Sequence, residues 1–166
     1  MNLVSIAASD APLRARPTSP PFPAAMVAKT AGREKRPLGD LFGLANFGVN
    51  LTRLAPGACS ALRHAHAKQD EFVYVLEGEA TLVSDAGETV LRQGMCAGFK
   101  AGTGDAHHLV NRSKSDVLFL EIGVALSDGV ERLFEVFWVI QKWQGLLPGL
   151  EGFVDFAFFV ECLSLV

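Results

Sequence analysis

Cysteine is scarce in this sequence, and several motifs that mark common enzyme classes are missing from it. The three cysteines, Cys59, Cys96 and Cys162, are odd in number and have no CxxC spacing. They therefore indicate ordinary buried thiols in a reducing compartment rather than a disulfide framework or a redox pair. The chain also lacks a glycine-rich phosphate loop followed by Lys and Ser or Thr, and it lacks a GxSxG nucleophile elbow. These absences argue against a P-loop nucleotidase and against a serine hydrolase.

Strong charge and long apolar runs are absent too. The formal net charge of 166 residues is −3, which gives no general attraction to nucleic acid or to anionic membranes. No uninterrupted apolar stretch is long enough to span a bilayer. The first residues, MNLVSIAASD, lack the positive start of a secretory signal. With no helix-turn-helix segment either, we expect a cytoplasmic protein that contacts neither nucleic acid nor membrane.

All four histidines fall in two short stretches. Residues 57–78 read GACSALRHAHAKQDEFVYVLEG, and residues 94–111 read GMCAGFKAGTGDAHHLVN. Alternation along a strand would turn His64 and His66 to the same side, and a polar turn could then return Glu71 beside them. Imidazole nitrogens with a carboxylate oxygen suit a divalent first-row metal ion.

Short strands at close spacing predict an all-β sandwich or barrel. Glycine, Asn and Asp turns separate these strands, including the hairpin turn at 85–87. The predicted strands are Val49–Leu54, the run EFVYVLEG from Glu71, Glu79–Ser84, Glu88–Arg92, Met95–Phe99 and Asp116–Val124.

Composition divides the chain into three parts. Residues 1–40 form a proline-rich N-terminal arm, in which the charged cluster GREKRP at 32–37 predicts a solvated turn. Residues 41–126 form the barrel. Residues 127–166 form a hydrophobic tail, whose segment VERLFEVFWVIQKWQGLL predicts a helix. The abrupt change in composition also allows a second hypothesis, an aberrant reading frame that begins near residue 125.

The two histidine stretches resemble the motifs of the cupins, most closely the small single-domain bacterial cupins. The first motif, glycine, spacer, HxH, Glu, six residues and Gly, is matched by His64, His66, Glu71 and Gly78. The second motif is matched by Gly94, Gly102, His107 and Asn111, although Lys100 stands where proline is usual. The resemblance covers about Leu41 to Val124 and implies a double-stranded β-helix, the jelly-roll barrel.

The resemblance implies four metal ligands, His64, His66, Glu71 and His107, around one divalent ion, which could be Fe, Mn, Ni, Co or Zn. His108 competes for the fourth place. Strand register favours His107, because an inward His107 places Leu109 and Asn111 inward and His108 outward. Asn111 is expected to tie down a turn.

The chemistry that follows stays open at this point. The resemblance implies a small polar organic ligand, transformed by a metal-dependent oxygenase, isomerase or decarboxylase, or bound by a non-catalytic sensor without a DNA-binding domain. Proton-transfer candidates near the metal are Glu77, Asp105, Arg63 and Lys100. The strand after Glu71 is apolar on both faces, so its outer face must be covered. A second subunit, the N-terminal arm or the C-terminal tail could cover it; a homodimer is the prediction, and coverage by the tail within one chain is the alternative.

Overall fold

The computed structural model describes residues 4–15 and 24–124 of the chain. The hydrophobic tail, its predicted helix, the alternative reading frame and Cys162 lie outside the described residues. The described helices are short: η1 (Ala8–Asp10), α1 (Ala24–Lys29) and α2 (Leu38–Leu41). The strands are β1 (Arg33–Pro37), β2 (Phe47–Leu54), β3 (Glu71–Glu77), β4 (Glu79–Ser84), β5 (Gly87–Arg92), β6 (Cys96–Phe99), β7 (His108–Val110) and β8 (Val117–Val124).

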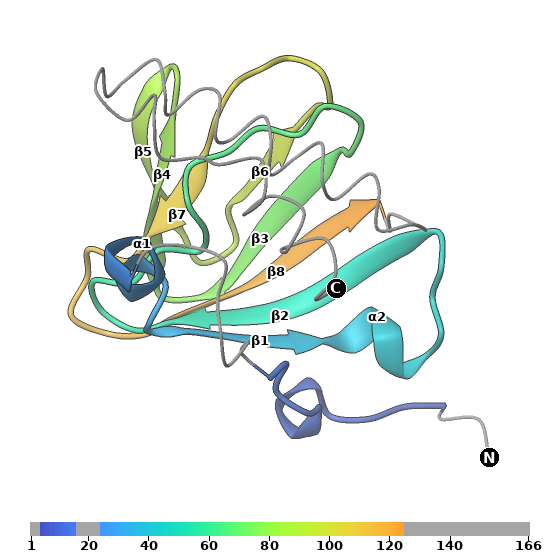
Figure 1. The fold of residues 1–166 in the computed structure, drawn as a ribbon. Helices are drawn as coiled ribbons and strands as arrows, with labels where there is room; N and C mark the ends of the chain where they lie inside the picture. The colour runs from blue at the N-terminus through green and yellow to red at the C-terminus, as the bar shows by residue number, and fades with distance from the viewer. Residues whose placement is uncertain (1–3, 16–23, 125–166) are drawn as a thin grey trace. The chain divides into compact units, whose positions relative to one another are not determined.

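The strands form two antiparallel sheets, one on each side of a common core (Figure 1). The larger sheet has the order β1-β2-β8-β3-β6, and the smaller has the order β5-β4-β7. Strand β8, which is late in the sequence, lies between β2 and β3 and pairs with both. This all-β jelly roll confirms the fold class that the sequence predicts, and the predicted strands begin within two residues of the observed ones.

Side-chain alternation places one face of each strand in the core. Val73 and Val75 of β3 are 2% and 0% exposed, and Val117 and Phe119 of β8 are fully buried beside them. Leu109, which precedes Asn111 on the second-motif segment, joins this core from the smaller sheet. Burial of these branched and aromatic side chains is the main force that holds the two sheets together.

The turn between β3 and β4 requires a glycine. Gly78 has a φ of +76°, and a Cβ atom there would lie 2.6 Å from the backbone oxygen of Asp116. Any larger residue would therefore cause backbone strain and would collide with the backbone of Asp116, the residue that precedes β8. The hairpin predicted at 85–87 is also present, because Ser84 pairs with Gly87 across it.

The charged cluster 32–37 is a strand, where the sequence predicts a solvated turn. Strand β1 pairs with β2 along its whole length, from Arg33 opposite Leu54 to Pro37 opposite Asn50. The prediction fails because no apolar alternation marks this strand. Its inward positions carry Arg33 and Lys35, whose partners are the Ser60 carbonyl and Glu121, both distant in sequence.

The outer face of β3 is exposed within the described residues. Phe72 and Tyr74 are 40% and 38% exposed, although Val73 and Val75 between and beyond them are buried. Their cross-strand neighbours are Ile122 and Leu120 of β8. The strand is thus apolar on both faces, as its sequence indicates, and the homodimer that would cover the outer face stays a prediction.

Candidate metal centre

The HxH pair lies in the loop between β2 and β3, not in a strand as the sequence predicts. The Pro56-Gly57 turn ends β2, and residues 55–70 form turns and bends with isolated bridges. One of those bridges joins His64 to His107: the His64 amide donates to the His107 carbonyl at 3.2 Å, and the reverse bond is 2.8 Å. These two backbone bonds bring the first and second motifs together.

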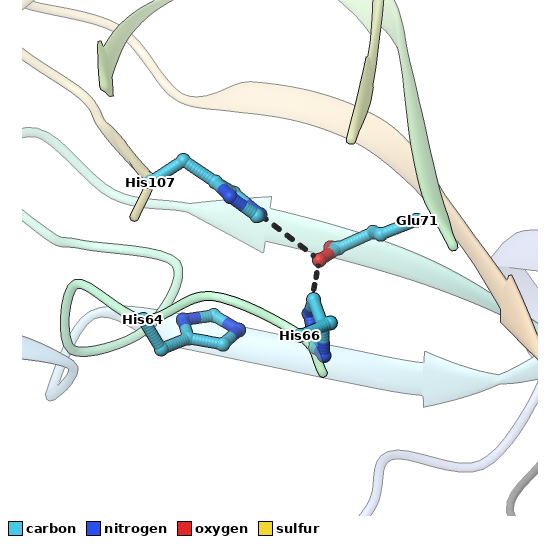
Figure 2. Close-up of side chains that lie close together, drawn as sticks. All are labelled: His64, His66, Glu71 and His107. Carbon is cyan, nitrogen blue, oxygen red and sulfur yellow. Dashed lines mark hydrogen bonds and ion pairs between the residues drawn. The ribbon is translucent and has the colours of Figure 1, made fainter. Parts of the chain in front are cut away.

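Four side chains converge at this point. His64, His66, Glu71 and His107 each offer one ligand atom, and these atoms all lie within 4.8 Å of one another. Figure 2 shows the three rings and the carboxylate turned toward one another, with Glu71 reaching in from β3. Glu71 Oε2 lies 2.8 Å from His66 Nε2 and 3.2 Å from His107 Nε2. The spacing suits four ligands of one ion.

Hydrogen bonds fix two of the imidazoles in the form that a metal ion requires. His64 Nδ1 lies 2.8 Å from the Leu62 carbonyl, and His107 Nδ1 lies 3.3 Å from the Asp105 carbonyl. A carbonyl can only accept, so a proton on Nδ1 satisfies each of these contacts and leaves the neutral ring with a lone pair at Nε2 for a metal ion. Metal-bound histidines are oriented by such bonds to the distal nitrogen.

The contact between His107 and Glu71 tests whether these residues fit a metal. A neutral His107 that donates through Nδ1 points a lone pair at Glu71 Oε2, which also carries only lone pairs. Two acceptors at 3.2 Å need a cation between them. A divalent ion bound by all four groups would supply it. The residues fit a metal.

Burial and hydrogen bonding set the charges of the cluster. Burial lowers the pKa of His64, and the neighbouring His66 lowers it further. Burial alone would raise the pKa of Glu71, but the neighbouring His107 and His66 rings hold it well below its usual range. A neutral imidazole and an ionised carboxylate are the forms that bind metal.

Neighbouring groups hold the ligands in place. The ring of Phe99 on β6 stacks on His107, with centroids 3.5 Å apart and planes 4° apart. The Gly102 amide donates to the His66 carbonyl at 2.9 Å, so the second glycine-rich loop holds the first motif. Arg63, which precedes His64, donates through Nε to the carbonyl of Ala106, which precedes His107.

The residues after His107 follow the register that the sequence predicts. Leu109 and Asn111 are buried, while His108 and Val110 are half-buried. His108 Nδ1 contacts the Ala61 carbonyl at 3.2 Å, and its ring lies outside the four-residue cluster. Asn111 ties down the turn before β8: its Nδ2 donates to the Leu54 and Ser115 carbonyls, at 2.9 and 2.8 Å.

The four proton-transfer candidates named from the sequence either interact with residues outside the cluster or are exposed to solvent. Arg63 pairs with Asp85, and Asp105 accepts a 2.8 Å hydrogen bond from the Asp85 amide. Glu77 and Lys100 are exposed. Sequence reasoning missed Glu121, a buried carboxylate on the inner face of β8. The sequence did contain an indication of it: Glu121 is the single charged residue in the apolar run 117–124, and alternation places it on the same face as Val117 and Phe119.

Fold and cluster together define a small β-barrel whose residues could hold a metal ion, and comparisons with known proteins agree on the fold. A cupin-domain family profile matches residues 50–123. A sugar phosphate isomerase of the cupin superfamily from Silicibacter pomeroyi is 42% identical, with a TM-score of 0.67 over 74% of this chain and 76% of that one. The chain belongs to the cupin superfamily.

Two further solved structures are similar. One is described as a putative sugar phosphate isomerase from Acidithiobacillus ferrooxidans, at 28% identity and a TM-score of 0.54, covering 63% of this chain and 74% of that one. The polyketide cyclase RemF from Streptomyces resistomycificus shares the fold at 19% identity and a TM-score of 0.60, covering 75% and 80%. The search of curated proteins found no match.

Within the described residues, none of the helices has the length and apolar character needed to cross a membrane.

Proposed function

We propose that His64, His66, Glu71 and His107 bind one divalent transition metal ion, and that the protein is a metal-dependent isomerase of small hydroxylated carbonyl compounds. The observation that carries the proposal is the convergence of these four ligand atoms within 4.8 Å. Three imidazoles and one carboxylate suit Fe, Mn, Ni, Co or Zn, and they leave positions of a six-coordinate ion free for substrate.

The isomerase class is favoured over the oxygenase and decarboxylase classes by similarity. The 42%-identical relative from Silicibacter pomeroyi is described as a sugar phosphate isomerase. A divalent ion, when bound, supplies Lewis-acid polarisation of a carbonyl oxygen. The protein supplies the orientation of the ligands through the Leu62 and Asp105 carbonyls, and a buried setting that strengthens charge interactions.

Metal content is the first test. Protein purified without a chelating tag is analysed for transition metals beside the His64→Ala/His66→Ala variant and the His108→Ala control. We expect about one equivalent in the wild type and the control, and a large loss in the double variant. A wild type that stays metal-free after reconstitution, or a control that loses its metal as well, contradicts the proposed site.

Catalysis needs a separate measurement. The metal-loaded protein is incubated in D₂O with aldose phosphates and followed by proton NMR. Isomerisation through proton transfer removes the hydrogen from C2 of the aldose, adds a solvent deuteron at C1 and produces the ketose. Binding of the same compounds without exchange would favour the other candidate, a non-catalytic ligand-binding cupin.

The same proposal includes the assembly and location of the protein. Phe72 and Tyr74 on the outer face of β3 would form the centre of a homodimer interface, and the protein would act in the cytoplasm on a small-molecule ligand. Analytical ultracentrifugation of the wild type and a Phe72→Glu/Tyr74→Glu variant tests the interface. A monomeric wild type would refute it.

A further inference from the structure

The inner face of the larger sheet carries a charged pair that the metal cluster does not use. Lys35 of β1 and Glu121 of β8 form an ion pair, with side chains 22% and 10% exposed. Strand β2 lies between β1 and β8 in the sheet, so β1 and β8 are about 10 Å apart. The two side chains must therefore lie across the inner surface of β2, over Asn50 and Thr52.

The pair lies beside the metal cluster in the strand register. Glu71 pairs with Gly123 of β8, and Val73 pairs with Glu121, so Glu121 is the diagonal neighbour of Glu71 on the same face. Diagonal neighbours in an antiparallel sheet have Cα atoms roughly 7–8 Å apart, within reach of long side chains. A molecule held at the metal therefore comes close to Glu121.

The metal ligands come from other segments than this part of the inner face. The four come from the loop before β3, from β3 itself and from the residue before β7. Strands β1, β2 and β8 contribute none of them. Their inner faces instead carry the Lys35–Glu121 pair, with Asn50 opposite Glu121 and Thr52 opposite Lys35.

Folding alone does not account for these polar groups. An ion pair this deeply buried adds little net stability, because desolvation offsets the attraction between the charges. The hydroxyl of Thr52, a residue that is fully buried, has no hydrogen-bond partner among the described residues. An unpaired buried hydroxyl costs free energy, so this part of the sheet is not built for stability alone.

We propose that the Lys35–Glu121 pair is the substrate-binding wall of the metal site, and that Glu121 binds the hydroxyl groups of a polyhydroxylated aldehyde or ketone. This inference rests on the proposed isomerase function and names the residues that would recognise its substrate. A carboxylate accepts hydrogen bonds from adjacent hydroxyls, and the ammonium donates to oxygen. The pair is neutral overall, so it suits the hydroxylated chain of the substrate rather than a phosphate group.

The test uses metal-loaded, full-length protein with ribose 5-phosphate and glucose 6-phosphate as probes, and inorganic phosphate as the reference. Binding is measured by calorimetry for the wild type, for Glu121→Gln and for the double variant Lys35→Met/Glu121→Leu. The double variant replaces the pair by apolar side chains of similar size, a change that buried ion pairs tolerate. Glu88→Gln, which removes the charge of an exposed carboxylate paired with Arg112, is the matched control.

We expect Glu121→Gln to weaken sugar phosphate binding about 10- to 100-fold, the loss expected for a charged hydrogen bond, and the double variant to abolish it. Metal content, phosphate binding and the Glu88→Gln control should match the wild type. Unchanged sugar binding in both Glu121 variants overturns the inference. Loss of metal in both variants also overturns it, because the pair would then support the metal cluster rather than contact substrate.

The two proposals fail in different ways. A wild type without metal refutes the metal site directly, before any sugar is added. A metal-loaded wild type that binds neither sugar phosphate refutes the substrate class inferred from the wall, while the metal site stands.

Discussion

The buried hydroxyl of Thr52 makes a prediction about stability that runs against the usual direction of core mutations. Thr52 is 0% exposed, and its Oγ1 has no partner among the described residues. Valine has nearly the same shape and removes only the hydroxyl. Because an unpaired buried hydroxyl costs about 1–3 kcal/mol, Thr52→Val should stabilise the ligand-free protein by about that amount.

A second buried hydroxyl gives the opposite expectation and serves as the control. Ser60 is 8% exposed, and its Oγ accepts a hydrogen bond from the Leu109 amide at 2.9 Å. Ser60→Ala leaves that buried amide unpaired, which should cost about 1–3 kcal/mol. The two variants therefore should differ by about 2–6 kcal/mol in their free energy of unfolding, with opposite signs relative to the wild type.

Urea unfolding at fixed metal content measures both variants, and similar m values would show that the extent of unfolding is unchanged. If Thr52→Val destabilises the protein, its hydroxyl has a partner in solution, such as a bound water, and Thr52 then gives no sign that the sheet gives up stability beside the Lys35–Glu121 pair. If Thr52→Val stabilises the protein but weakens sugar phosphate binding, the hydroxyl is retained for the ligand at the expense of stability.

Three further outcomes are expected. Asn111→Ala removes the hydrogen bonds to the Leu54 and Ser115 carbonyls and should cost about 2–4 kcal/mol in urea unfolding; a loss below about 1 kcal/mol would mean that the turn is held by other contacts. Gly78→Ala should destabilise more than Gly94→Ala, because both have positive φ but only Gly78 faces a backbone atom, at 2.6 Å; equal thermal shifts would contradict this. Metal should be released as the pH falls, because a protonated imidazole cannot bind it, and the lowered pKa of buried His64 keeps that ligand neutral to a lower pH than an ordinary imidazole; dialysis followed by metal analysis would refute this if metal stays bound at about pH 4, well below the usual imidazole pKa.

The sequence by itself predicted six of the eight described strands, all but β1 and β7, and its resemblance to a known family named the four side chains that converge. Period-two alternation and glycine turns are local signals, so β4 is predicted with its observed bounds, Glu79–Ser84. The cluster was predictable because its members are few and lie in two motifs: His64, His66, Glu71 and His107 come together as the motif spacing implies. Register also placed Asn111 inward, and it is fully buried.

Local signals failed where partners are distant in sequence. The HxH pair needed no strand to turn both rings inward, because the bridge from His64 to His107 fixes the loop instead. The exposed Cys96, predicted as a buried thiol, lies opposite Tyr74 on the outer face of the sheet. The sequence alone could not reveal which face of that short strand is outward.

The tertiary structure alone decided which residues neighbour the four-residue cluster. The charges of β1 indicate a solvated turn until β2 and β8 come to lie beside it, in the order β1-β2-β8. Only that order brings Lys35 to Glu121, and only the pairing of β3 with β8 places Glu121 diagonal to Glu71. Strand order is set by burial of the whole sheet rather than by any local pattern, so a contact between two distant charges becomes visible only in the folded protein.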